Sequence, residues 1–150
     1  MAKFVYKMQN ILDIKLRLET QVKTEFAEAS AKLLQEEDKL RKLIQRRREY
    51  ENELKRLSAD RLELGELKKY NGYIETIKAL MQQQALAVRL AQRNLDKVRE
   101  KLNQAMQERK IYEKLREKAF EEFKEELNAE EKKEMDQLVS FTYNDKSEDS

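Results

Sequence analysis

The sequence predicts an all-α fold: one long antiparallel coiled-coil hairpin made of two helices. Three observations lead to this prediction. The 150 residues include no proline and only two glycines, and 41% of them are charged, a composition typical of long helices and coiled coils. Hydrophobic residues recur in alternating steps of three and four, the spacing that keeps them on one side of a helix. This series breaks at one place, near Gly65, and resumes after it.

The first helix is expected to run from about Lys3 to between Ser58 and Leu64. Its hydrophobic seam consists of Val22, Phe26, Ala29, Leu33, Leu40, Leu43, Tyr50, Leu54, Leu57 and Leu64. A slightly different seam serves its first turns, namely Phe4, Met8, Ile11 and Leu18. The change of seam indicates a stutter that locally relaxes the supercoil. An irregular N-terminal end explains the spacing equally well, and both interpretations stay open.

The hinge is predicted near residues 58–66. Gly65 is the expected helix terminator because glycine tolerates the left-handed backbone conformation. Ser58 and Asp60 are suited to open a wider loop, since side chains of these types cap helix ends.

The second helix is expected to follow, and the hairpin domain is expected to end at residue 143. Its seam consists of Leu67, Tyr70, Ile74, Ile77, Met81, Val88, Ala91, Leu95, Val98, Leu102, Ala105 and Tyr112. Residues 144–150 are polar, and we expect a short disordered tail there. Charge is segregated: from Glu121 onward there are 11 acidic and 4 basic residues, whereas residues 1–120 carry a net charge of +9.

Two pairings of the arms are consistent with the seams. In the preferred one, the numbers of facing residues sum to 131, which sets large side chains against small ones, such as Phe26 against Ala105. In the alternative, shifted by one heptad, they sum to 124, and Arg47 faces Ile77 rather than Gln84. Polar residues at seam positions are Glu36, Arg47, Arg61, Gln84, Arg109 and Arg116. They indicate either that polar layers specify the register or that the rod is weakened so that it can bend.

The composition argues against an enzyme. The sequence has no histidine and no cysteine, so the usual general base, the thiolate nucleophile and the common soft metal ligands are missing. The carboxylates alternate with Lys and Arg, which is typical of a solvated, salt-bridged surface rather than a catalytic pair. We therefore expect no catalytic residue, no cofactor site and no metal site.

Nucleic acid and membranes are also disfavoured as direct partners. Arg46, Arg47 and Arg48 form the one tight basic cluster, and no aromatic stacking platform accompanies it. No run of about 18 uncharged apolar residues is present that would span a membrane, and the first seven residues do not resemble a signal peptide. A cytosolic protein is expected.

Five short segments of the sequence are distinctive. They are Lys3-Phe4 to Ile11-Leu12, Leu43-Ile44 followed by Tyr50, residues 66–74 (ELKKYNGYI), residues 108–115 (ERKIYEKL) and residues 130–137 (EEKKEMDQ). Together they resemble the FliJ family, the small coiled-coil proteins of the flagellar type III export apparatus. The resemblance covers about residues 3–140.

This resemblance implies a role that periodicity does not supply. FliJ-family proteins are antiparallel coiled coils similar to the central stalk of rotary ATPases. They sit in the hexameric ring of the flagellar export ATPase and promote its assembly, contact the cytosolic linker of the export gate protein, and have been linked to the recycling of export chaperones. The resemblance thus implies a cytoplasmic protein, recruited through its partners to the inner-membrane base of the flagellum, and links it to protein export, flagellum biogenesis and chemotaxis.

The resemblance also implies two sets of contact residues. The export-gate contacts are Lys39, Leu43, Arg46, Tyr50, Tyr73, Ile77, Leu80 and Gln84. The ATPase contacts, at the end of the hairpin opposite the hinge, are Phe4, Lys7, Met8, Ile11, Lys15, Arg109, Lys110 and Arg116. Tyr73 falls off the seam and is the best candidate for an anchor of the gate linker, whereas packing competes with binding as the explanation for Tyr50.

Two other interpretations remain open from the sequence. One keeps the architecture and makes the chain the equivalent stalk of a virulence-type III secretion ATPase. The other is a passive structural scaffold coiled coil with no ATPase partner.

Overall fold

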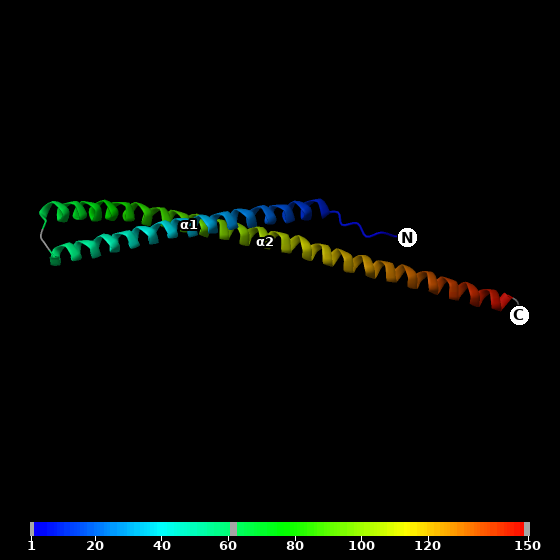
Figure 1. Cartoon of the computed structure of the whole chain (residues 1–150). Helices are drawn as coiled ribbons and strands as arrows, with labels where there is room; N and C mark the ends of the chain where they lie inside the picture. The colour runs from blue at the N-terminus through cyan, green and yellow to red at the C-terminus, as the bar shows by residue number, and fades with distance from the viewer. Residues whose placement is uncertain (1, 61–62, 149–150) are drawn as a thin grey trace. The chain divides into compact units, whose positions relative to one another are not determined.

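The computed structural model describes residues 2–60 and 63–148, and these residues form two helices (Figure 1). Helix α1 spans Gln9–Asp60 and helix α2 spans Leu64–Glu148, with no strand among the described residues. The two helices pack against each other, so the prediction of an all-α fold built on two long helices is confirmed.

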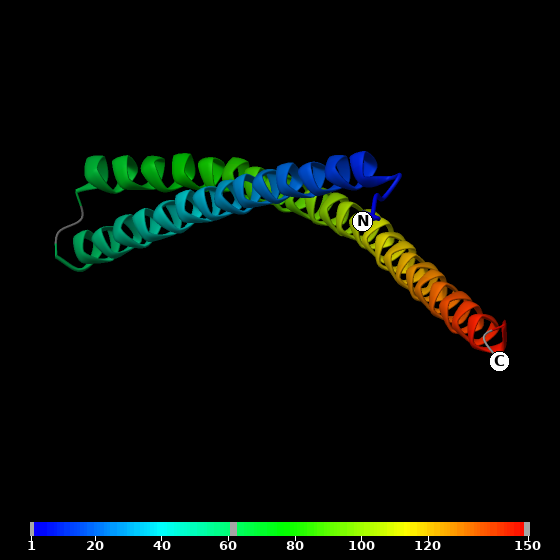
Figure 2. The ribbon, with the colours of Figure 1, turned by 90° about the vertical axis from the view of Figure 1, so that its right-hand side faces the viewer.

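The chain divides into two compact units, which are described separately. The hinge unit is Thr20–Gln104, and the terminal unit consists of Met1–Glu19 and Ala105–Ser150. In the hinge unit, the part of α1 drawn in cyan lies beside the part of α2 drawn in green (Figures 1 and 2). In the hinge unit, Glu25 pairs with Lys101 and the later Glu36 bonds to the earlier Gln84. In the terminal unit, Phe4 packs on Phe120 and the later Lys15 bonds to the earlier Glu108, so the two segments run antiparallel in each unit.

The core of the hinge unit confirms the central part of the predicted seams. Ala29 and Leu33 of α1 are buried together with Ala91 and Leu95 of α2. Partly buried Phe26, Val88 and Val98 pack against this cluster. Alanine on each helix beside leucine on the other fills the space between the helices, because a small side chain leaves room for a large one.

The register preferred from the sequence is wrong, and the alternative shifted by one heptad agrees with the structure. In the hinge unit, Lys101 pairs with Glu25 and Gln84 bonds to Glu36, and these residue numbers sum to 126 and 120. In the terminal unit, Arg109 pairs with Glu19 and Lys15 with Glu108, for sums of 128 and 123. All four sums lie close to 124. This register is favoured because it gives the buried carboxylates of Glu19 and Glu36 a polar partner on the other helix.

The stutter near the start of the first helix, one of the two interpretations that the sequence left open, is absent. Leu12, Glu19 and Val22 are buried, whereas Ile11 and Leu18 are exposed. The inward positions are therefore Leu12, Lys15, Glu19, Val22 and Phe26, which follow regular steps of three and four. The sequence did not show this series because Lys15 and Glu19 occupy two of the inward positions. The exposed aliphatic residues Ile11 and Leu18 were therefore assigned to the seam in their place.

The N-terminal residues precede the helix rather than belonging to it. α1 begins at Gln9, whose backbone amide donates to the carbonyl of Tyr6 (3.1 Å) and whose side chain donates to Asp13 (2.9 Å). The Tyr6 hydroxyl donates to the carbonyl of Tyr112 at 3.3 Å. The first residues are thus fixed by contacts with α2, which explains why the helix starts later than the predicted Lys3.

The helix ends at the hinge differ from the prediction. α1 ends at Asp60, and α2 begins at Leu64, so Gly65 lies in the first turn of α2 with no positive φ. The prediction that Gly65 terminates a helix is therefore wrong. A glycine is tolerated in a first turn, where Glu66 also complements the helix dipole, and Ser58 bonds to the Leu54 carbonyl (2.7 Å) within α1. Of the predicted hinge, residues 61 and 62, including Arg61, lie outside the described residues.

The C-terminal part of the chain is helical further than expected. α2 reaches Glu148, so residues 144–148 of the predicted disordered tail belong to the helix, and residues 149–150 lie outside the described residues. Within the described part of the chain, neither helix contains a stretch long and apolar enough to cross a membrane.

Candidate protein-interaction surfaces

The predicted gate contacts form two matching rows in the hinge unit. Lys39, Leu43, Arg46 and Tyr50 follow steps of four, three and four along α1, and Tyr73, Ile77, Leu80 and Gln84 follow the same steps along α2. Each row therefore occupies one side of its helix. Pairing the first row with the reversed second row gives residue numbers that sum to 123 in all four pairs, which agrees with the observed register of about 124. We call these two rows the gate patch.

Three tyrosines pack together at one end of the gate patch. The Tyr50 and Tyr73 rings have centroids 5.3 Å apart, Tyr50 and Tyr70 are 6.0 Å apart, and Tyr70 and Tyr73 meet edge to face at 5.7 Å. The Lys69 ammonium lies 5.8 Å from the Tyr73 ring centroid. Tyr73 remains 38% exposed, so it presents an aromatic surface held in place by its neighbours. The sequence assigned Tyr70 to the seam and missed its place in this cluster.

Glu36 organises the other end of the gate patch, although the sequence did not include it among the contacts. Its side chain is buried, and Gln84 of α2 donates to both its carboxylate and its backbone carbonyl. Lys32 and Lys39 pair with the same carboxylate from neighbouring turns of α1, at 2.9 and 3.7 Å. The bond from Lys32, followed by that from Gln84, lowers the pKa of Glu36. Lys39 and Gln84 therefore have internal roles.

The residues of the gate patch differ in how much surface they offer. Ile77 is buried in the interface between the helices, and Leu43 and Tyr50 are half-buried. Lys39, Arg46, Tyr73 and Leu80 are exposed. The structure thus places all eight predicted residues in one unit, but packing accounts for part of the set and four of them are exposed.

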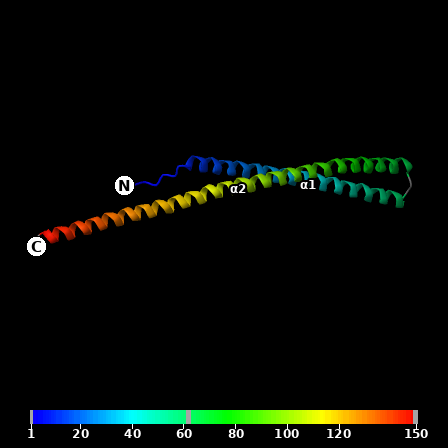
Figure 3. The same ribbon diagram turned by 180° about the vertical axis from the view of Figure 1, so that it is seen from behind.

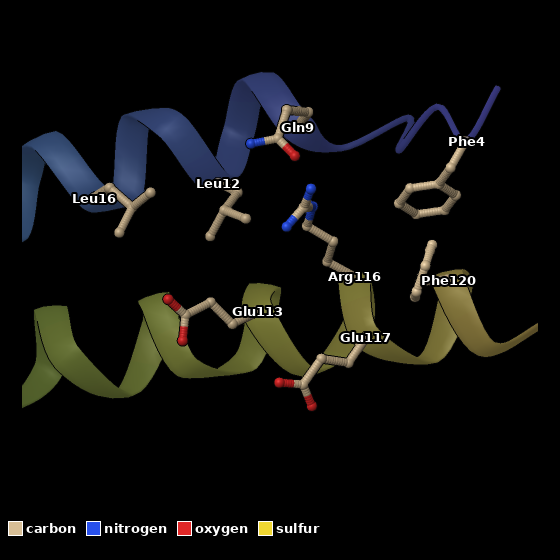
Figure 4. A pocket seen from close by; sticks show the side chains of 8 residues that line it. All are labelled: Phe4, Gln9, Leu12, Leu16, Glu113, Arg116, Glu117 and Phe120. Carbon is tan, nitrogen blue, oxygen red and sulfur yellow. The ribbon is translucent and has the colours of Figure 1, made fainter.

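The terminal unit begins with an aromatic cluster that holds the N-terminal segment on α2. The Phe4 ring meets Phe120 edge to face at 5.1 Å and tilts against Phe123 at 5.6 Å. Leu12 and Leu16 line an open groove next to this cluster (Figure 4). In the figure the Arg116 side chain extends from α2 toward α1, between Leu12 and the Phe4 ring.

Two of the predicted ATPase contacts are committed to ion pairs inside the unit. The guanidinium of Arg109 donates to both carboxylate oxygens of buried Glu19 (2.7 and 3.2 Å) and to Glu113 (2.9 Å). The hydrogen bond to Glu19, then that to Glu113, raises the pKa of Arg109. Lys15 donates to Glu108 at 2.9 Å, which raises the pKa of Lys15. These side chains hold the two helices in register, a role the sequence did not predict for Lys15.

The other predicted ATPase contacts leave surface available. Lys7, Met8, Ile11, Lys110 and Arg116 are exposed, whereas Phe4 is half-buried against its aromatic neighbours. This part of the terminal unit combines exposed cations with exposed aliphatic side chains. Such a surface suits binding to a protein with acidic and apolar groups.

No group of three or more acidic, histidine or cysteine side chains among the described residues is arranged to hold a metal ion. The geometry offers two candidate surfaces for protein binding, the gate patch and the exposed cations and aliphatic side chains of the terminal unit. The model of the flagellar FliJ protein family matches residues 4–148, nearly the whole chain. The chain belongs to the FliJ family.

Membership of this family makes the chain a component of the flagellar export apparatus. The family consists of structural export-apparatus proteins rather than known enzymes. No curated protein and no solved structure gives a significant match to the chain.

Proposed function

We propose that this FliJ-family chain is a non-enzymatic coiled-coil stalk of the flagellar export ATPase. In this role the exposed residues of the terminal unit engage the ATPase hexamer and promote its assembly, and the gate patch contacts the cytosolic linker of the export gate. Through these contacts the chain supports protein export and chaperone recycling in the cytoplasm, at the inner-membrane base of the flagellum.

The observation that carries the proposal is the gate patch. Two rows of residues that the family resemblance assigned to one partner lie opposite each other in the observed register, and Tyr50 and Tyr73 are in direct ring contact. Exposed Arg46 and Tyr73 belong to the residue types enriched among interface anchors, and exposed Leu80 adds apolar surface to the patch.

Binding of the purified gate linker tests the gate contact. Truncation of an anchor typically reduces affinity about thirtyfold, so we expect Tyr73→Ala to weaken binding by that order, while helix content and Tm stay near the parent values. Leu86→Ala is the matched control because Leu86 is an exposed residue of α2 outside the gate patch. Equal affinities of the parent and Tyr73→Ala would remove Tyr73 from the contact.

ATP hydrolysis by the export ATPase tests the second contact. Reversing two exposed cations with Lys110→Glu and Arg116→Glu should abolish most of the stimulation that the parent chain gives. Arg89→Glu with Arg93→Glu reverses two exposed cations of α2 in the hinge unit and should leave stimulation intact. Stimulation by the first variant that equals the parent's would contradict the assignment, and stimulation lost equally in both variants would show that only overall charge matters.

A further inference from the structure

The C-terminal segment of α2 continues beyond the part of the terminal unit that α1 and the N-terminal residues cover. Phe4 packs on Phe120 and Phe123, and from residue 128 to residue 141 every side chain is exposed. In Figures 1 and 3 the orange and red part of α2 runs past the N-terminal segment with no other described element beside it.

Four large hydrophobic side chains lie on this exposed segment. Met135, Leu138, Val139 and Phe141 are 65–72% exposed. The first three are spaced three and four residues apart, so they share one face of the helix, and Phe141 follows one turn after Leu138. We call these four residues the apolar stripe. Exposed hydrophobic residues are ordinary one at a time, but a contiguous group on one helix face is typical of an interaction site.

Most of the apolar stripe does not continue the side of α2 that faces α1. The inward series runs through Ala105, Arg109 and Tyr112 to Phe123, and the half-buried residue that follows is Leu127, because Glu126 is exposed. Steps of seven from Arg109, Tyr112 and Phe123 lead to the polar residues Glu130, Lys133 and Gln137, and steps of seven from Leu127 lead to Phe141. Met135, Leu138 and Val139 lie on another side of the helix. The stripe is therefore suited to a partner that approaches α2 from a direction different from that of α1.

Charge indicates which partner fits. Residues 121–141 contain eight acidic and three basic residues, and Glu131 and Glu134 lie one turn before Met135 and Leu138. A second copy of the segment would bring acidic residues against acidic residues, which is unfavourable, whereas a basic surface is complementary.

We propose that the apolar stripe, with its acidic borders, docks an amphipathic helix of a partner protein whose apolar face is bordered by lysine and arginine. The two helices pack side by side through their apolar faces, and the carboxylates beside the stripe select the basic partner. None of its residues belongs to the gate patch or to the exposed cations of the terminal unit.

Fluorescence anisotropy with the full chain and a designed peptide tests the proposal. The probe is a labelled peptide of about 18 residues, roughly 27 Å as a helix, with leucine on one face and lysine on the other. A peptide of the same composition, rearranged so that the leucines share no face, should bind at least about tenfold more weakly because it cannot bury them together. Equal binding of the two peptides would show that the interaction depends on charge alone, and this would overturn the proposal.

Two variants locate the site. Met135→Gln with Val139→Gln removes apolar surface without adding charge and should weaken the designed peptide about tenfold. Leu86→Gln with Leu90→Gln, at the same spacing on α2 and with side chains 53% and 55% exposed in the parent, should leave its affinity within about twofold. Similar losses in both variants would overturn the proposal.

Charge and self-association complete the test. Glu131→Gln with Glu134→Gln should weaken the designed peptide and flatten its salt dependence. Sedimentation of the parent chain alone should show no dimer that depends on the stripe. A dimer that disappears in the Met135→Gln, Val139→Gln variant would assign the stripe to a second copy instead.

Discussion

Among the residues whose burial the structure describes, the two buried carboxylates sit in layers with different cross-helix partners. In the terminal unit, Glu19 meets a guanidinium from the other helix, and Arg109 bonds to both of its oxygens. In the hinge unit, Glu36 meets a neutral amide from the other helix, Gln84, and its cations come from its own helix. The cross-helix partner is thus a cation in the first layer and a neutral amide in the second.

This difference separates two tasks that polar layers perform in coiled coils. A bidentate arginine fixes both the position and the direction of the partner carboxylate, so the Glu19 layer specifies how α1 and α2 align. In the Glu36 layer, Lys32 and Lys39 stay with Glu36 wherever α2 is placed, so only Gln84 depends on the alignment. We therefore expect the two layers to respond differently when the cross-helix residue is removed.

Arg109→Leu should be the most destabilising of these changes, because it removes the cross-helix cation from a buried carboxylate. We expect Tm to fall by roughly 5 °C or more. Thermal unfolding followed by circular dichroism measures it. The double variant Glu19→Leu, Arg109→Leu replaces the whole pair with apolar residues and should recover most of the loss. A double variant no more stable than the single one would contradict the account of this layer.

Gln84→Leu should have a smaller effect, because Lys32 and Lys39 still neutralise Glu36. A fall in Tm of roughly 2–4 °C is expected from the lost cross-helix hydrogen bonds. The same unfolding experiment compares it directly with Arg109→Leu. If Gln84→Leu is the more damaging of the two, the proposed contrast between the layers is wrong.

Acidification should reveal the Glu36 layer selectively. The folded-state pKa of Glu36 is lowered, so its contribution to stability is complete above the ordinary glutamate pKa of about 4.3. This contribution decreases as the pH falls below that value and is lost once the pH passes the lowered folded pKa, because the unfolded state takes up the proton first. Glu36→Gln should therefore lose less stability than the parent between pH 6 and the acidic range. Identical pH profiles would contradict the pKa shift.

Removing an exposed cross-helix pair should matter least. Lys101 and Glu25 are 3.0 Å apart, but both side chains are substantially exposed to water. Surface pairs of this kind contribute little, so Lys101→Ala should change Tm by no more than about 2 °C. A loss comparable to that of Arg109→Leu would show that burial does not set the ranking.

The sequence predicted the architecture but not the alignment. Periodic leucine and alanine positions identified both helices, because apolar residues at seam positions produce a clear pattern. The same criterion failed at Lys15 and Glu19, whose inward positions carry charge. It also failed for the register, where side-chain volumes favoured one pairing and the partners of Glu36 and Glu19 favour the other. Pairing of buried polar groups depends on three-dimensional proximity, which periodicity does not report.

The candidate surfaces were also predicted only in part, because spacing along a helix does not report which side chains are buried or paired. The family resemblance selected residues of the gate patch that the structure brings together, because their spacing along each helix is regular. It did not separate Ile77, which is buried, from Leu80, which is exposed, and it did not distinguish Arg109, which pairs internally, from exposed Lys110. The apolar stripe was also missed, because its hydrophobic residues lie off the seam that the sequence analysis followed.

Intramolecular crosslinking tests the register most directly. The chain has no native cysteine, so only the two introduced thiols can form a disulfide within one chain. Leu33→Cys with Ala91→Cys places the two thiols in the same core cluster, whereas Leu40→Cys with Ala91→Cys places them opposite each other only in the register whose numbers sum to 131. Disulfides require Cα atoms within about 7 Å. We expect rapid oxidation within one chain for the first pair and little for the second. Efficient crosslinking of the second pair, with little of the first, would contradict the register on which the gate patch and both polar layers depend.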